Sequence, residues 1–96
     1  YIDFYGRFGA VGIAINPLTE ELLVTNMRSS SGPKTLSVVD PQSLTVTKKI
    51  TVGSGPSGVC VSGDGNRIYV VNHDSNNVTV IEASSYNVIA TVAVES

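Results

Sequence analysis

The amino-acid sequence repeats itself once, and this repeat limits the fold more than any other feature of the chain. When Gly12 is placed under Gly58, the two halves agree in residue type over most of their length. The paired segments are 12–16 with 58–62, 22–26 with 68–72, 36–40 with 78–82, and 46–52 with 88–94. A repeat of this kind is one structural unit that buries its apolar face against its neighbours, so the sequence predicts two copies of one unit.

Each copy holds four short segments rich in Val, Ile, Thr and Tyr, and turn residues separate them. β-Branched and aromatic residues favour strands, whereas clusters of Gly, Asn, Asp and Ser, such as those at 63–66 and 75–77, favour hairpin turns. No long segment shows the apolar period of a helix. Four antiparallel strands within repeats of 46 residues (9–54) and 42 residues (55–96) predict an all-β chain with two blades of a β-propeller.

The composition of the strands predicts where each one lies in its blade. The first segment of each copy is small and apolar, which suits an innermost strand crowded between neighbouring blades. Cys60 lies in such a segment, between Val59 and Val61, so it is predicted to be buried and slow to react. The fourth segment of the first copy carries Lys48 and Lys49, which suit an exposed outermost strand because lysines discourage edge pairing.

Two short motifs resemble the signature of the YVTN β-propeller repeat family. They are YVVN at 69–72 and LVTN at 23–26, with GPSGV at 55–59, SGDG at 62–65 and VIE at 80–82 around the second. The resemblance covers residues 9–96 and is looser in the first copy, where 16–19 reads NPLT. It implies a ring of about six to eight blades and a secreted, periplasmic or cell-surface protein, with a cytoplasmic location left open. The repeat is structural, so the resemblance implies no catalytic residues.

Two blades leave two sheet faces without a neighbour, and about three repeats are the usual minimum for stability. The expected partners are therefore copies of this chain or further blades of the same propeller. The aromatic segment 1–8 is predicted to be a strand or linker that belongs to a preceding or completing blade.

Polar loops on one rim of the predicted propeller are the candidate binding site. The loops between second and third strands share this rim with the loops that enter the first strands, and loops on a rigid scaffold commonly carry binding. The candidate ligand-binding residues are Arg28, His73, Asp74 and Asn76, for a protein or small-molecule ligand. Asn26 and Asn72 are predicted to hydrogen-bond backbone within their blades, and Glu20-Glu21 is predicted to be a solvated turn.

The remaining features favour binding over chemistry. One Cys and one His fall short of a metal site, and no residues match a nucleophile, His and carboxylate arrangement, so no catalytic residue, metal or cofactor is predicted. A net charge of −2 with scattered basic residues argues against a nucleic-acid partner, and no apolar stretch approaches the roughly 20 residues needed for membrane insertion. The predicted function is a non-catalytic propeller module that acts as a binding or surface scaffold. Two alternatives stay open: a fragment of a propeller-based enzyme of lactonase or redox type, and a small ring-forming lectin-like binder.

Overall fold

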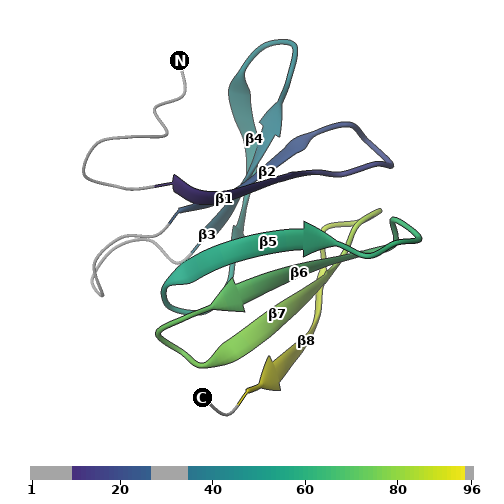
Figure 1. Ribbon diagram of the computed structural model, residues 1–96. Helices are drawn as coiled ribbons and strands as arrows, with labels where there is room; N and C mark the ends of the chain where they lie inside the picture. The colour runs from purple at the N-terminus through teal and green to yellow at the C-terminus, as the bar shows by residue number, and fades with distance from the viewer. Residues whose placement is uncertain (1–9, 27–34, 95–96) are drawn as a thin grey trace.

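The computed structural model describes residues 10–26 and 35–94, which form two four-stranded antiparallel sheets (Figure 1). The first sheet, blade 1, consists of β1 (Ala10–Ile15), β2 (Leu22–Asn26), β3 (Thr35–Asp40) and β4 (Thr45–Thr51). The second sheet, blade 2, consists of β5 (Pro56–Val61), β6 (Arg67–Asn72), β7 (Asn77–Glu82) and β8 (Val88–Ala93). Each strand pairs with the next along the chain, so the predicted all-β fold with two four-stranded sheets is confirmed. The segment 1–8 lies outside the described residues.

The first strand of each blade begins earlier than the repeat alignment predicts. β1 starts at Ala10 and β5 at Pro56, and each pairs with the last residue of the following strand across a register shift. The shift falls between Ala10 and Gly12 in blade 1 and between Pro56 and Gly58 in blade 2. A β-bulge therefore occurs at the same place in both copies. Because a bulge breaks the two-residue alternation of a strand, the alternation pattern does not predict the pairing before it.

The turns of the two blades also correspond. The N–H of Asn16 donates to the carbonyl of Glu21 at 2.9 Å, and the N–H of Ser62 donates to that of Arg67 at 2.8 Å. In blade 2 the turn is closed by Gly65 at a φ of +78°, a conformation that glycine adopts without steric cost. Hydrogen bonds from the Ser62 hydroxyl and the Asn66 N–H hold the pKa of Asp64 below its ordinary value.

The blades pack face to face, with β1 against β5 (Figure 1). Their shared core is built from Leu23, Leu36, Val38, Ile50 and Val52 of blade 1 and from Ile68, Val70, Ile81 and Ala83 of blade 2. The backbones of the two blades come close together at Gly12, where an added Cβ would lie 3.2 Å from the Cα of Gly58. A glycine at Gly12 therefore lets the innermost strands of the two blades come together.

Strand alternation gives each blade one face in this joint and one face directed away from it. In blade 1, Ala14 packs against the core, whereas Ile13 and Ile15 on the opposite face are 58% and 59% exposed. In blade 2 the opposite set of positions packs against the core, because Val59 and Val61, which align with Ile13 and Ile15, contact it.

Cys60 points to the face of blade 2 that is directed away from the joint and is exposed, so the prediction that it is buried is wrong. The sequence context of Cys60 is apolar on both sides, as predicted. Burial on an innermost strand, however, requires a neighbouring blade on each face, and among the described residues the other blade packs against the face of Val59 and Val61.

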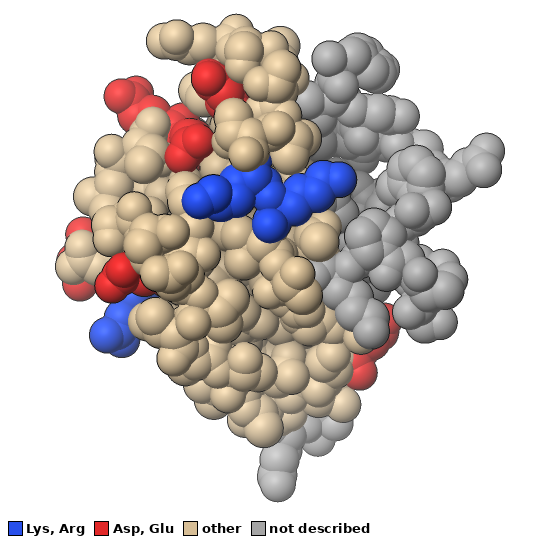
Figure 2. Space-filling view, turned by 180° about the vertical axis from the view of Figure 1, so that it is seen from behind, with Lys and Arg blue, Asp and Glu red and all other residues tan. Residues whose placement is uncertain are grey.

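The outer strand of blade 1 is open to solvent as its lysines suggested. All residues of β4 except Ile50 are exposed, including Lys48 and Lys49. Figure 2 shows the basic side chains of this side of the molecule gathered mainly in one short group, with acidic side chains apart from it. Over the described ranges, no helix is long and apolar enough to cross a membrane.

Candidate functional site

The rim loop between β6 and β7 is anchored to the segment that leads into β5. The N–H of His73 donates to the carbonyl of Gly55 at 2.8 Å, and the N–H groups of Asp74 and Ser75 both donate to the carbonyl of Ser54. In return, the N–H of Ser54 donates to the Ser75 hydroxyl at 2.7 Å. The loop that was predicted to carry ligand contacts is therefore held by four hydrogen bonds to the same neighbouring segment.

Glycines make this close contact possible. Gly55 has a φ of +66°, and a Cβ there would lie 2.7 Å from a carboxylate oxygen of Asp74. A Cβ on Gly53 would lie 2.8 Å from the side chains of Asn72 and Asn77. A Cβ on Gly55 would also lie 3.0 Å from the backbone nitrogen of Asp74, so a larger residue there would push the rim loop away from its support. A larger residue at Gly53 would displace the side chains of Asn72 and Asn77.

Asn72 anchors the base of the same loop through its side chain. It is 1% exposed, and its Nδ2 donates to Asn77 Oδ1 and Thr79 Oγ1, each at 2.8 Å. The structural role predicted for Asn72 is present, but its partners are side chains and not the predicted backbone groups. Its Oδ1 is buried without a hydrogen-bond partner, which costs about 1–3 kcal/mol unless a water or ligand donates to it. The side chain of Asn26 lies outside what the structure describes.

Three of the four predicted ligand-binding residues lie together on this anchored loop. His73 and Asp74 have side chains 73% and 44% exposed, and His73 Nδ1 lies 3.2 Å from Asp74 Oδ1. Asn76 is also exposed and adopts a φ of 53°, while its carbonyl accepts a hydrogen bond from the N–H of Val94. The fourth residue, Arg28, lies outside the described residues. An imidazole, a carboxylate and an amide thus share one rigid loop.

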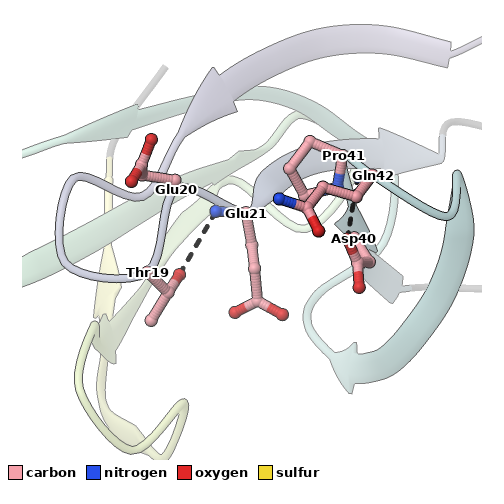
Figure 3. A pocket seen from close by; sticks show the side chains of 6 residues that line it. All are labelled: Thr19, Glu20, Glu21, Asp40, Pro41 and Gln42. Atoms are coloured by element: carbon pink, nitrogen blue, oxygen red, sulfur yellow. Dashed lines mark hydrogen bonds between the residues drawn. The ribbon is translucent and has the colours of Figure 1, made fainter.

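A hollow of about 380 Å³ lies elsewhere, beside the turns that join β1 to β2 and β3 to β4 (Figure 3). Its lining residues are Thr19, Glu20, Glu21, Asp40, Pro41 and Gln42. Asp40 Oδ1 accepts hydrogen bonds from the N–H groups of Gln42 and Ser43, so this carboxylate stabilises its own turn. In the part of the chain that is described, no group of three or more His, Cys, Asp or Glu residues could hold a metal ion.

Sequence reasoning missed a polar cluster that joins the two blades. Asn16 of blade 1 is fully buried, and its Nδ2 donates to the carbonyl of Ala83 at 3.0 Å and to the hydroxyl of Tyr86 at 2.9 Å. The Tyr86 hydroxyl donates in turn to Glu21 Oε1 at 2.7 Å. The ammonium of Lys48 lies 5.5 Å from the centroid of the Tyr86 ring.

This cluster corrects the prediction that Glu20 and Glu21 form a solvated turn. Glu20 is an exposed turn residue as predicted, but Glu21 is half-buried and bonded to the other blade. Burial raises the pKa of Tyr86 above its ordinary value, and the hydrogen bond to Glu21 raises it further. The repeat alignment held one signal of this cluster. Asn16 aligns with Ser62, and the larger amide stands in the copy whose turn contacts the other blade.

Comparisons with known proteins agree with the fold. No family model matches the chain. It is 51% identical over 51 residues to PE-PGRS family protein PE_PGRS18 of Mycobacterium tuberculosis, and 50% identical over 36 residues to hydrazine synthase subunit beta of Kuenenia stuttgartiensis. These matches cover 53% and 38% of this chain. The chain spans only 10% and 9% of the length of these curated relatives.

Solved structures match over a larger part of the chain. Hydrazine synthase of Kuenenia stuttgartiensis superposes with a TM-score of 0.75 at 25% identity, over 100% of this chain and 27% of that one. Apo AztD of Citrobacter koseri superposes with a TM-score of 0.68 at 17% identity, over 93% of this chain and 24% of that one. Both neighbours are propeller-type proteins. The two sheets of this chain are thus β-propeller blades.

Proposed function

We propose that the chain is a non-catalytic β-propeller module that holds a binding surface on the rim formed by the β6–β7 loop. The observation that carries this proposal is the anchoring of that loop. Its backbone is tied to residues 54 and 55, while His73 and Asp74 extend into solvent. Rigid backbone beneath exposed polar groups lowers the entropy lost on binding, which favours recognition of a protein or small-molecule ligand.

The chemistry of the loop fits a polar ligand that both donates and accepts hydrogen bonds. A carboxylate accepts, an amide does both, and an imidazole does either according to its tautomer. Peptide groups and sugar hydroxyls meet this description. The same rim could therefore serve a scaffold for proteins or a lectin-like binder, and the ligand class is what the experiment must separate.

A titration followed by NMR tests this proposal. The ¹⁵N-labelled chain is mixed with a panel of soluble peptides and oligosaccharides, and amide shifts are recorded. We expect shifts at residues 73–76 together with Ser54 and Gly55, and their loss in the double variant His73→Ala/Asp74→Ala. The variant Glu20→Ala/Gln42→Ala, on the lining of the opposite hollow, is the matched control. Shifts confined to residues 17–20 and 41–44, or a panel that leaves residues 73–76 unmoved, would contradict the proposal.

A second candidate is a scaffold segment of a propeller-based enzyme of lactonase or redox type. The match to a subunit of hydrazine synthase favours it, because that protein is named as part of an enzyme. Turnover of model lactones and reduction of a dye acceptor would separate the two. Turnover that is lost in His73→Ala/Asp74→Ala would favour the enzyme over the binding module.

We include membership of the YVTN repeat family and a location outside the cytoplasm in the same proposal. The motif YVVN lies on β6 and ends at Asn72, whose buried side chain supports the rim loop. This gives the motif a structural purpose in the blade. Fractionation of the source cells tests the location, and recovery of the protein only in the cytoplasm would contradict it.

A further inference from the structure

The outermost strands of the two blades differ in the residues along their free edges. Each of β4 and β8 pairs with one strand of its sheet, so the outer side of each presents backbone N–H and C=O groups without a strand partner among the described residues. β4 carries Lys48 and Lys49, and charged side chains on an edge oppose pairing with another strand. At the same repeat positions β8 carries Ala90 and Thr91, and its sequence VIATVA contains no charged residue and no proline. The edge of blade 2 is therefore able to accept another strand.

Further blades of a propeller would leave this edge uncovered, because blades contact one another through their faces. In the joint within this chain β1 and β2 lie against β5, and β8 lies at the opposite side of its sheet from β5 (Figure 1). A blade stacked on the other face of blade 2 would cover Val92, as the shared core covers its repeat counterpart Ile50. The outer backbone of β8 would stay in solvent, as all six of its residues are in this chain.

The pairing with β7 determines which residues of β8 turn their backbone groups outward. The N–H of Val94 donates to the carbonyl of Asn76, so the backbone groups of Val94 point toward β7. Successive residues of an antiparallel strand alternate between the two sides, so those of Ala93 and Val92 alternate in turn and those of Thr91 point away from β7. The register shift in this pair lies before Ala90, so the edge is regular from there to Val94.

The sequence of β8 is complementary to itself when two copies of the strand run antiparallel. If Thr91 stands opposite Thr91 of a second copy, the other opposed pairs are Ala90 with Val92, Ile89 with Ala93, and Val88 with Val94. In two of these pairs an alanine faces a larger side chain, and opposed threonines can hydrogen-bond each other. The outward backbone groups of Thr91 also stand opposite their equivalents, which is the arrangement that an antiparallel ladder requires.

We propose that the free edge of β8 pairs antiparallel with β8 of a second copy of this chain, centred on Thr91. The contact is isologous, because the same strand serves on both sides of a two-fold axis. A six-residue strand buries far less than the roughly 1,200 Å² of a standard interface, so the association is weak and reversible. The inference is independent of the rim loop, of any ligand that binds there and of the number of blades in the ring.

Disulfide crosslinking tests both the edge and its register. In Cys60→Ser/Thr91→Cys the two introduced thiols stand directly opposite each other, and the Cα atoms of such a pair lie about 5.5 Å apart, within disulfide range. Cys60→Ser/Ala93→Cys is the matched control, because residue 93 is exposed on the same strand. Its two copies are four positions apart in this register, or about 13 Å. In a glutathione redox buffer we expect the first variant to form a covalent dimer of twice the 10.0 kDa mass at least tenfold faster than the second.

Sedimentation equilibrium up to millimolar concentration measures the association without a crosslink. Thr91→Lys gives β8 the residue type of Lys49 at the same repeat position and sets two ammonium groups opposite each other. We expect it to weaken dimer formation by about tenfold. Thr51→Lys adds the same charge to the exposed end of β4 and should leave the dimer unchanged. Circular dichroism checks that each variant keeps its strands.

Three outcomes would overturn the proposal. The first is an unmodified chain that stays at 10.0 kDa up to millimolar concentration, which would leave this edge to solvent or to another protein. The second is equal crosslinking of the two cysteine variants, which would mean chance collision. The third is association that Thr91→Lys and Thr51→Lys affect equally, which would place the contact on a blade face.

Discussion

Blade 1 and blade 2 share one repeat, yet equivalent residues differ in burial. Ala14 packs against the core, whereas its equivalent Cys60 is exposed. Ile13 is 58% exposed, whereas its equivalent Val59 packs against the core. The backbone pairing is the same in both blades, so the difference comes from which face has a neighbour. In a stacked repeat, burial is a property of the joint as much as of the residue.

The turns between the third and fourth strands of the two blades have the same geometry but different surroundings. Leu44 and Tyr86 hold equivalent places, with φ of 57° and 62°, and their N–H groups donate to Asp40 and Glu82 at 2.8 and 2.7 Å. Leu44 is 51% exposed, whereas Tyr86 reaches Asn16 in the other blade. One turn geometry therefore serves as a surface in blade 1 and as a contact in blade 2.

The largest expected effect is a difference in the free energy of unfolding between substitutions on the two faces of blade 1. Leu23→Ala removes a side chain that is 0% exposed, and we expect the free energy of unfolding to fall by about 2–5 kcal/mol. Ile13→Ala on the face directed away from the joint should change it by about 0.5 kcal/mol or less at concentrations where the chain is monomeric. Urea denaturation followed by circular dichroism measures both. Equal losses for the two variants would mean that the blades do not share the core described above.

A smaller effect is expected from the polar cluster. Asn16→Ala leaves the Ala83 carbonyl and the Leu18 N–H without their partner, so we expect a loss of about 1–3 kcal/mol. Ser62→Ala, at the equivalent place in blade 2, affects exposed hydrogen bonds within its own turn and should cost about 1 kcal/mol or less. The same denaturation experiment compares them. A larger loss for Ser62→Ala would reverse the proposed difference between the two turns.

The contrast between blades explains what could be predicted from sequence. Strand order and turn positions follow from local residue types, and these are the same in both copies, so the two sheets were predictable. Cys60 was mispredicted because its burial depends on a neighbour that no local pattern reports. Glu21 was mispredicted because its partner, Tyr86, lies 65 residues away and contributes only one hydroxyl.

The sequence predicted which residues lie on the candidate rim, but not the hydrogen bonds that hold the rim loop. Polar loop residues on a propeller rim led to His73, Asp74 and Asn76, and all three lie on one loop. The support beneath them was hidden, because Ser54 and Gly55 hold the loop through backbone groups that every residue type carries. Similarly, the choice of side-chain partners by Asn72 depends on Asn77 and Thr79 across a hairpin, which the motif alone does not specify.

The smallest expected effect concerns the pH dependence of stability and Tyr86, which joins the two blades. Burial raises the pKa of Tyr86 above 10.0, so near that pH the folded chain keeps a phenol proton that the unfolded chain is losing. The native state then binds more protons, and the contribution of Tyr86 to stability is complete below about pH 10 and falls as pH rises through this value. Tyr86→Leu gives blade 2 the residue type of Leu44 and removes this titration. We therefore expect the gap in unfolding free energy between the unmodified chain and Tyr86→Leu to narrow from neutral pH to above pH 10. Urea denaturation at both pH values measures it, with Leu44→Ala as a control whose gap should not change. A gap that stays constant or widens would show that the pKa of Tyr86 is not higher in the folded chain than in the unfolded chain.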